Sequence, residues 1–375
     1  MELKNEAEAA IAEDPLGTIE KFKKTHYPQI TNEKWNDWKW QLSNSIRTTT
    51  ELKKFLEITE EENVDNKKLP LRITPYYLSL ICNSAALRKT MVPTYRELEK
   101  SFGEELDPLG ENEDSPVPGL VHRYPDRVLF LTTDSCACNC RYCTRSRIIE
   151  NGSQKINYDN AINYIERHPE IRDVILSGGD PLTLSDSTIE YLLQRLRNIA
   201  HVEIIRIGTK VPFVLPQRIT DDLVNILKKY HPLFISIHAT HPEEITEESK
   251  IAIEKLANAG IVLGSQTVLL KDVNNSAKTL KKLFHGLLRL RVKPYYLYQC
   301  DPIIGSAHFK TKVEEGINII QSLRGFTSGY AIPQYVIDAP GGGGKIPIMV
   351  NSIVAEDEKF IYLKNYEGEI YKYPV

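Results

Sequence analysis

The sequence Cys136-Ala-Cys-Asn-Cys-Arg-Tyr-Cys143 has a C-x3-C-x2-C spacing and follows an apolar run at residues 128–131. Cysteine thiolates are the usual protein ligands of iron–sulfur clusters, and a cluster used for electron transfer alone normally takes four of them. Three thiolates on one short loop can hold three irons of a [4Fe–4S] cube and leave the fourth iron open to a small molecule. We therefore predict a cluster with an open iron, held by Cys136, Cys140 and Cys143.

The chain has six cysteines, and four of them lie within these eight residues. This clustering argues against a disulfide framework and indicates a metal or cluster site in a reducing compartment. Cys138 breaks the spacing, and we interpret it as a non-ligand. Zinc is the main competing metal, but its sites commonly use two separated cysteine pairs, and no second pair is present. Cys138 or a distant histidine could still complete a four-ligand zinc site.

The length of 375 residues suits a barrel-sized catalytic domain with an extension. Hydrophobic residues make up 41%, and the formal net charge of −3 gives no reason to expect a nucleic-acid or membrane-surface partner. No apolar run approaches the length of a membrane span, and the charged residues 1–8 contain no apolar signal core. We expect a cytoplasmic protein without a nucleic-acid or membrane partner.

Residues 1–118 are predicted to form a helical extension that ends in a linker. Helices are expected at residues 18–24, 50–58 and 95–102, and Thr74-Pro75 is expected to open another at 76–82. Asn32 is a candidate N-cap for a helix on which Trp35 and Trp38 share one face. Residues 103–118 are rich in Glu, Asp, Gly and Pro without periodicity, which is typical of a linker.

From Arg127 onward, strand and helix patterns alternate. Strands are predicted at residues 128–132, 174–176, 202–207, 233–237, 262–268 and 294–297, and helices at 158–167, 188–198, 221–229, 247–259, 277–290 and 313–323. This alternation indicates βαβ units and a parallel sheet. We predict an α/β fold with an incomplete (β/α)6, TIM-like barrel over residues 119–330. Function in such folds collects at the carboxyl ends of strands, where the cysteine loop and Ser177-Gly-Gly-Asp180 stand.

Residues 331–375 are predicted to form a small C-terminal β segment, with a strand at 346–350 and a hairpin of residues 360–364 and 370–373. The run Pro340-Gly-Gly-Gly-Gly-Lys345 does not match a phosphate-binding loop, because Ala339 and Ile346 replace its required residues. A lysine on a sterically open loop suits a Schiff base, as in pyridoxal phosphate (PLP) enzymes. A solvated loop lysine is the alternative.

Together these motifs resemble the lysine 2,3-aminomutase family of the radical S-adenosylmethionine (SAM) superfamily, from around Asn32 to Val375. The resemblance rests on the following segments: Cys136 to Arg145, Ser177-Gly-Gly-Asp180-Pro-Leu, Arg206-Ile-Gly-Thr, Pro216-Gln-Arg-Ile-Thr220, His241-Pro-Glu-Glu-Ile-Thr, Gln266-Thr-Val-Leu-Leu, Tyr298-Gln-Cys-Asp301, His308-Phe-Lys-Thr and Gly341-Gly-Gly-Gly-Lys345-Ile-Pro.

The resemblance implies roles for individual residues. It assigns Cys136, Cys140 and Cys143 to the cluster, Lys345 to PLP as the catalytic lysine, and Arg127 and Arg123 to PLP binding. Arg145 is implied to pair with the substrate carboxylate, and Asp301 and Asp338 to hold its distal ammonium. The implied SAM contacts are Ser177, Gly178, Gly179, Asp180, His238 and Gln266.

The implied activity is that of an isomerase that converts L-lysine to β-lysine with a [4Fe–4S] cluster, SAM and PLP. The 5′-deoxyadenosyl radical would take a hydrogen from the substrate β-carbon, and the nitrogen would migrate from α to β. The implied partners are an amino acid substrate, a reductant such as flavodoxin or ferredoxin, and further copies of the chain in a homo-oligomer, either dimer or tetramer. Because no cysteine follows Cys300, we expect no zinc site of the kind that relatives carry at the C-terminus.

The two aspartates also bear on the choice of substrate. Two carboxylates in a closed site resist ionisation unless a cation lies between them, and a lysine ammonium meets that need. A guanidinium also suits two carboxylates, so arginine stays open as a substrate. Two further alternatives remain: β-lysine supply for modification of a translation factor, and a metal-bound structural module without enzymatic activity.

Overall fold

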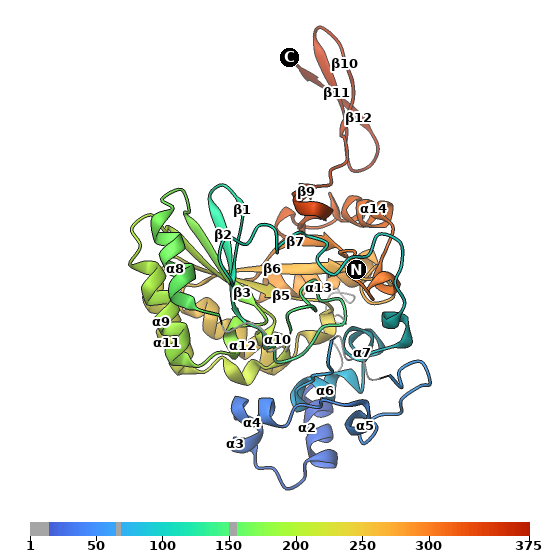
Figure 1. The fold of residues 1–375 in the computed structure, drawn as a ribbon. Coiled ribbons are helices and arrows are strands. Elements are labelled where there is room, and N and C mark those ends of the chain that lie inside the picture. Colours follow the sequence, from blue (N-terminus) through green and yellow to red (C-terminus); the bar gives the residue numbers. More distant parts are fainter. Residues whose placement is uncertain (1–14, 65–68, 150–155) are drawn as a thin grey trace.

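The computed structural model describes residues 15–64, 69–149 and 156–375. The charged segment at residues 1–8, which argued against a signal peptide, lies outside these residues. The body is a nine-stranded sheet whose strands follow one another in chain order from β1 to β9 (Figure 1). Strands β2 to β8 pair in parallel, and β1 and β9 pair antiparallel at the two ends. The architecture is an open, partial α/β barrel.

The strands are β1 (Leu120–Tyr124), β2 (Arg127–Thr133), β3 (Asp173–Gly178), β4 (Ile204–Thr209), β5 (Leu233–His238), β6 (Val262–Leu269), β7 (Lys293–Gln299), β8 (Gln334–Ala339) and β9 (Gly344–Pro347). The helices between them are α8 (Tyr158–Arg167), α9 (Asp186–Arg197), α10 (Val211–Val214), α11 (Asp221–Leu227), α12 (Glu247–Asn258), α13 (Ala277–Arg289) and α14 (Val313–Leu323). All six predicted strands and all six predicted helices are confirmed, with small shifts at their ends. Strand β8 adds a seventh parallel strand that the six-unit prediction did not include.

Local chemistry explains why the predicted helices begin where they do. The residue before α8 is Asn157, and α9, α12 and α13 are preceded by Ser185, Thr246 and Ser276. Each of these side chains accepts a hydrogen bond from a backbone N–H in the first turn of its helix. Because such caps satisfy donors that the helix itself leaves unpaired, the start of a helix can be read from sequence.

Strand periodicity decides which side chains face the interior of the barrel. In β4, Ile205 and Ile207 are fully buried in the core, whereas Arg206 and Gly208 line an internal cavity. Alternate residues of a strand point to opposite faces, so each parallel strand gives one set of side chains to the helix layer and the other to the interior.

The N-terminal extension packs beneath the barrel as several short helices (Figure 1): α2 (Pro15–His26), α3 (Asn32–Trp35), α4 (Trp38–Ser43), α5 (Thr49–Leu52), α6 (Pro75–Ile81), α7 (Ala85–Met91) and the 3-10 turn η2 (Tyr95–Leu98). The helices expected at 50–58 and 95–102 are therefore wrong in extent, since each is a single turn. The opening of α6 by Thr74-Pro75 is confirmed, because the Thr74 side chain accepts from the Tyr77 N–H.

Two predictions near the tryptophans are wrong. Thr31, not Asn32, is the N-cap of α3. Trp35 and Trp38 do not share a helix face, because they lie on separate helices. The Asp37 side chain accepts from the Lys39 N–H and starts α4 anew. Trp35 is buried and contacts the ring of Trp40 instead, with centroids 5.8 Å apart.

The C-terminal residues form a separate three-stranded antiparallel sheet that projects from the body (Figure 1): β10 (Ile353–Glu356), β11 (Phe360–Lys364) and β12 (Ile370–Pro374). The predicted hairpin is confirmed as β11 and β12, and β10 was not predicted. The strand expected at 346–350 begins earlier, at Gly344, because β9 pairs with β8. The division of the chain at residues 118 and 330 stays a prediction.

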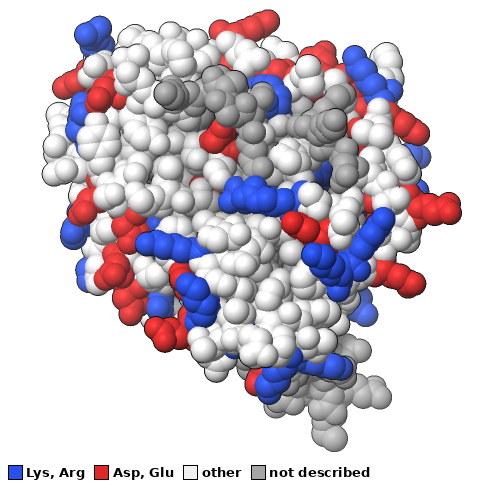
Figure 2. Space-filling view, turned by 60° about the horizontal axis from the view of Figure 1, so that its bottom comes forward, with Lys and Arg blue, Asp and Glu red and all other residues white. Residues whose placement is uncertain are grey.

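On the face shown in Figure 2, basic and acidic side chains lie interspersed among uncharged residues. Within the described part of the chain, no helix has both the length and the apolar character needed to cross a membrane.

Candidate functional site

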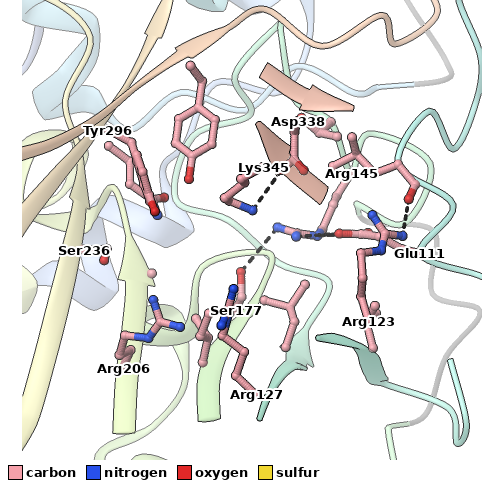
Figure 3. A pocket seen from close by; sticks show the side chains of 18 of the residues that line it. Glu111, Arg123, Arg127, Arg145, Ser177, Arg206, Ser236, Tyr296, Asp338 and Lys345 are labelled. Atoms are coloured by element: carbon pink, nitrogen blue, oxygen red, sulfur yellow. Dashed lines mark hydrogen bonds and ion pairs between the residues drawn. The ribbon is translucent and has the colours of Figure 1, made fainter. Parts of the chain in front are cut away.

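The interior of the partial barrel holds a cavity of about 550 Å³ (Figure 3). Nine of the residues predicted for the site line it: Arg123, Arg127, Arg145, Ser177, His238, Gln266, Asp301, Asp338 and Lys345. They come from nine different strands or loops, so only the closure of the sheet brings them together. The three predicted cysteines and the segment Gly178 to Asp180 do not line this cavity and lie on loops at its border.

The cysteine loop follows β2 and is held by the N-terminal extension. The Asn139 N–H donates to the Arg72 carbonyl at 3.0 Å, and the Arg141 N–H donates to the Thr90 carbonyl at 2.9 Å. Cys138 is buried, and its sulfur accepts from the Thr74 N–H at 3.4 Å. Cys138 is therefore bonded to the extension, and its interpretation as a non-ligand stays a prediction.

The three predicted ligands are buried thiols that influence one another. Burial, together with the neighbouring Cys140, raises the pKa of Cys143 to about 11. The pKa of Cys136 is also raised, first by burial and then by Cys143. Cations oppose these shifts, with Arg145 lowering the pKa of Cys143 and Arg72 that of Cys136. Thiols must be deprotonated to bind metal, so nearby cations favour the bound state.

A [4Fe–4S] cluster and a single metal ion need different arrangements of thiols. Among the described residues, no three His, Cys, Asp or Glu side chains converge on a point where one metal ion could sit. In a [4Fe–4S] cube each thiolate binds its own iron, so separated thiols on one loop are the expected arrangement.

The glycines of Ser177-Gly-Gly-Asp180 are required by the cysteine loop itself. A Cβ on Gly178, whose φ is +117°, would lie 2.3 Å from the Thr133 oxygen, and one on Gly179 would lie 2.3 Å from the Ser135 oxygen. The Asp180 N–H also donates to the Ser135 carbonyl at 2.8 Å. In the structure the group that these glycines admit is protein backbone.

The Asp180 carboxylate joins the loops after β3 and β4. It accepts from the Thr209 hydroxyl at 2.7 Å and from the backbone N–H groups of Lys210 and Val211 at 2.7 and 3.2 Å. These bonds fix the border of the cavity next to the cluster loop. As SAM contacts, Gly178, Gly179 and Asp180 stay predictions.

His238 and Gln266 are paired neighbours on β5 and β6. The His238 Nε2 lies 3.0 Å from the hydroxyl of Tyr142, a residue of the cysteine loop, and the two rings stack with centroids 5.6 Å apart. Burial, together with Lys210, lowers the pKa of His238 to about 3. The imidazole is therefore neutral at physiological pH and can accept or donate a hydrogen bond.

Lys345 is the second residue of β9 and lies opposite Asp338 of β8. Its Nζ is 2.9 Å from the Asp338 Oδ2 (Figure 3), and its N–H donates to the Tyr124 hydroxyl at 2.9 Å. Gly341, Gly342 and Gly344 have φ values of +68°, +86° and +74°, which side-chain-bearing residues rarely adopt. The glycine run thus makes the reversal that turns Lys345 into the cavity.

Asp301 is a partly buried carboxylate at the end of β7. It accepts from the Thr144 hydroxyl at 2.6 Å. Burial raises the pKa of Asp301 to about 6, and the negative charge of Asp338 contributes to the rise. Two nearby buried carboxylates are stabilised by a cation placed between them. The pair therefore offers a site for a positively charged group.

The two arginines predicted to bind PLP make different contacts with the protein. The Arg127 guanidinium stacks on the Tyr124 ring at 3.8 Å, and its Nη1 lies 2.9 Å from Asp126. Arg123 donates to the Asp114 carboxylate at 2.6 Å and to the Leu109 carbonyl, so it is bound to the linker, residues 103–118. Arg127 thus keeps more donors for a phosphate than Arg123. Together with Lys345 and the cavity tyrosines, this donor set fits PLP.

Sequence reasoning missed several residues of the cavity. Glu111, from the linker, forms an ion pair with Arg145 (Figure 3), and no local pattern distinguishes it from the other acidic linker residues. Tyr296 and Tyr298 also line the cavity. Tyr296 lies on the predicted strand 294–297 and Tyr298 directly follows it, so their spacing of two residues was a usable signal for a shared face.

Comparisons with known proteins agree with this arrangement. Residues 320–375 match the family described as Lysine-2,3-aminomutase, and residues 130–283 match the Radical SAM superfamily. The L-lysine 2,3-aminomutase of Fusobacterium nucleatum is 50% identical over 361 residues, covering 94% of this chain and 85% of that protein. The enzyme of the same name from Clostridium subterminale is 51% identical over 357 residues (92% and 86%). The glutamate 2,3-aminomutase of Clostridioides difficile is 44% identical over 354 residues (91% and 83%).

Proposed function

Because the chain belongs to the lysine 2,3-aminomutase family of the radical SAM superfamily, we propose that it is an isomerase converting L-lysine to β-lysine. The observation that carries the choice of lysine is the carboxylate pair Asp301 and Asp338, of which Asp338 is buried and Asp301 partly buried. Both line one cavity with Lys345 and Arg145. A substrate with a carboxylate at one end and a cation at the other matches Arg145 and the two aspartates. The negative side chain of glutamate would be repelled by the aspartates.

The cofactors supply the difficult chemistry when bound: the cluster and SAM provide a 5′-deoxyadenosyl radical, and PLP allows the nitrogen to migrate between adjacent carbons. We propose that Cys136, Cys140 and Cys143 hold the cluster. Ser177, Gly178, Gly179, Asp180, His238 and Gln266 are the proposed SAM contacts, and Lys345, Arg127 and Arg123 the proposed PLP contacts.

The protein's own contribution is orientation and charge. Arg145 binds the substrate carboxylate, and Asp301 and Asp338 hold the distal ammonium, so the carbon chain is fixed at both ends. The Asp338 carboxylate lies 2.9 Å from the Lys345 Nζ. It can therefore also hold the ammonium group of Lys345 whenever that residue is not bonded to the cofactor. Tyr296 and Tyr298 form an aromatic wall that helps to exclude water from reactive intermediates.

The proposal is tested by incubating anaerobically reconstituted protein with SAM, PLP, a chemical reductant and L-lysine. We expect β-lysine to form and 5′-deoxyadenosine to depend on SAM. Parallel reactions with arginine, ornithine and glutamate separate the nearest activities, because a guanidinium also fits two carboxylates. Absence of β-lysine from a preparation that carries cluster and PLP would disprove the proposal, and preferential turnover of arginine would reassign the substrate.

Three further expectations belong to this proposal. A flavodoxin or ferredoxin is the proposed reductant of the cluster. A cytoplasmic location is supported by the six free cysteines. A homo-oligomer, dimer or tetramer, is supported by exposed apolar side chains on the projecting C-terminal sheet, among them Ile353, Ile370 and Tyr371. An isolated sheet of this size gains stability by packing against another surface.

A further inference from the structure

The Arg145 guanidinium gives one of its edges to Glu111. Its Nε lies 3.0 and 3.1 Å from the two Glu111 carboxylate oxygens, and its Nη2 lies 2.6 Å from one of them. Nη1 lies on the opposite edge, 3.4 Å from the Ser177 hydroxyl (Figure 3). A guanidinium has five N–H donors in a planar fork. Glu111 therefore leaves the edge with Nη1 able to bind a second carboxylate.

The Glu111 carboxylate forms ion pairs with two arginines, so its negative charge does not compensate Arg145 only. The Arg147 Nη2 lies 3.1 Å from Glu111 and 3.1 Å from Asp107. Asp107 also accepts from the Glu111 N–H at 3.2 Å and so fixes the turn that carries it. Glu111 is buried, and although burial alone would raise its pKa, Arg145 and Arg147 hold that pKa below its ordinary value. The Glu111 carboxylate is thus ionised, and ion pairs with two arginines hold it in place.

The linker that carries Glu111 also touches the loops that bear the other substrate groups. The Glu104 carboxylate accepts from the Ser306 N–H at 3.1 Å, in the loop after Asp301. The Pro108 carbonyl accepts from the Gly341 N–H at 2.9 Å, in the loop that leads to Lys345. One short segment thus spans the carboxylate end, the ammonium end and the cofactor lysine of the proposed site.

We propose that Glu111 is a positioning residue for the substrate carboxylate, holding Arg145 by one edge so that the opposite edge faces the cavity. This inference rests on the proposed function, since it takes an amino acid with a free α-carboxylate as the ligand. A charged hydrogen-bonded fork is strongly directional, so a fixed guanidinium binds a second carboxylate without first losing rotational freedom. Arg145 without Glu111 would keep its charge but lose its orientation.

The test compares two amines that differ only in the carboxylate: L-lysine and 1,5-diaminopentane. Binding of each to the PLP-loaded protein is followed by the change in cofactor absorbance, without turnover. In Glu111→Gln, whose amide places donors against the guanidinium, we expect lysine affinity to fall about 10- to 100-fold. The affinity for 1,5-diaminopentane should stay unchanged. In turnover, the KM for lysine should rise more than kcat falls, as expected for lost ground-state binding.

The matched control is Glu97→Gln. Glu97 is buried and pairs with Arg141, another arginine of the cysteine loop, with 3.0 Å between the Arg141 Nε and a carboxylate oxygen. Neither residue lines the cavity. We expect Glu97→Gln to lower thermal stability without changing the ratio of the two affinities.

Glu111→Asp is the second variant. It keeps the negative charge between the two arginines, so it is expected to fold even if Glu111→Gln fails to fold. It should give a smaller, lysine-specific loss, since the shorter side chain moves the carboxylate away from Arg145. Equal weakening of both amines in the Glu111 variants, or no weakening, would overturn the role of Glu111. A wild-type protein that makes no β-lysine and does not prefer lysine over the diamine would instead overturn the proposed function.

Discussion

The two loops that carry the proposed cofactor ligands are built in opposite ways. The cysteine loop is enclosed, with backbone hydrogen bonds to Arg72, Thr90 and the segment after β3. The lysine loop, residues 340–345, leads into β9, the last strand of the main sheet. A Cβ on Gly341 would have no atom within 4 Å, and Ile346 is 49% exposed.

The difference matches what each loop has to do. A cluster is held only if its thiolates keep fixed positions, so the loop needs many anchors from several segments. A lysine that binds a cofactor reversibly has to move to and from a carbon atom, and glycines with positive φ next to an edge strand permit such movement. Rigid anchoring and local freedom are therefore combined around one cavity.

The largest expected effect comes from removing a cluster ligand. Cys136→Ala should lose the cluster, and both 5′-deoxyadenosine and β-lysine should fall to background. The paired variant Cys138→Ala should retain the iron, because Cys138 bonds to the extension. Iron and sulfide analysis with product assays checks both. Full iron content in Cys136→Ala, or its loss in Cys138→Ala, would show that the wrong cysteines were assigned.

Lys345→Ala removes the proposed attachment point of PLP and should separate PLP binding from cluster binding. We expect β-lysine to fall to background and PLP to be lost on gel filtration, because the covalent attachment point is gone. Iron content should stay at the wild-type level, since Lys345 bonds to Asp338 and Tyr124, which lie outside the cysteine loop. The cofactor spectrum and iron analysis measure this. Retained PLP together with retained activity would assign the cofactor to another lysine.

A methyl group added to one glycine at a time tests how closely each of the two loops is packed. Gly179→Ala places a Cβ 2.3 Å from the Ser135 backbone oxygen, so the cysteine loop has to shift. We expect a loss of about 1–3 kcal/mol in unfolding free energy and poorer cluster retention. Gly341→Ala meets no atom and should cost about 1–2 kcal/mol from its positive φ, with the cluster intact. Denaturant unfolding and iron content distinguish them, and equal iron loss in both would argue against the difference between the loops.

The smallest expected effect is a pH dependence of lysine binding. Asp301, which accepts a hydrogen bond from Thr144 of the cysteine loop, has a pKa raised to about 6, mainly by burial. Below that pH the carboxyl is protonated and neutral, so its attraction for the substrate ammonium is lost as pH falls. We expect lysine affinity to decline by about tenfold per pH unit at most below pH 6. Asp301→Asn should bind more weakly with a flat profile, and an unchanged pH step in this variant would assign the titration elsewhere.

Much of the fold was predictable because its signals are local. The helix α8 begins after the cap Asn157, and its apolar side chains recur at helical spacing, so both its position and its extent agree with the prediction. The region around Trp35 was mispredicted because Asp37 caps a second helix only two residues after the first ends. Short helices depend on tertiary contacts more than on periodicity, since a single turn gains little from its own hydrogen bonds.

The sequence by itself determined the chemistry that this protein can perform: three cysteines at a cluster spacing, a lysine after four glycines, and the alternation of strands and helices. Only the tertiary structure decided how these parts meet. Glu111 reaches Arg145 across 34 residues, and Thr144 reaches Asp301 across 157. The glycines after β3 prove to accommodate the cysteine loop. Such contacts depend on which loops the closing sheet brings together, and no local pattern in the linker or in these loops encodes that choice.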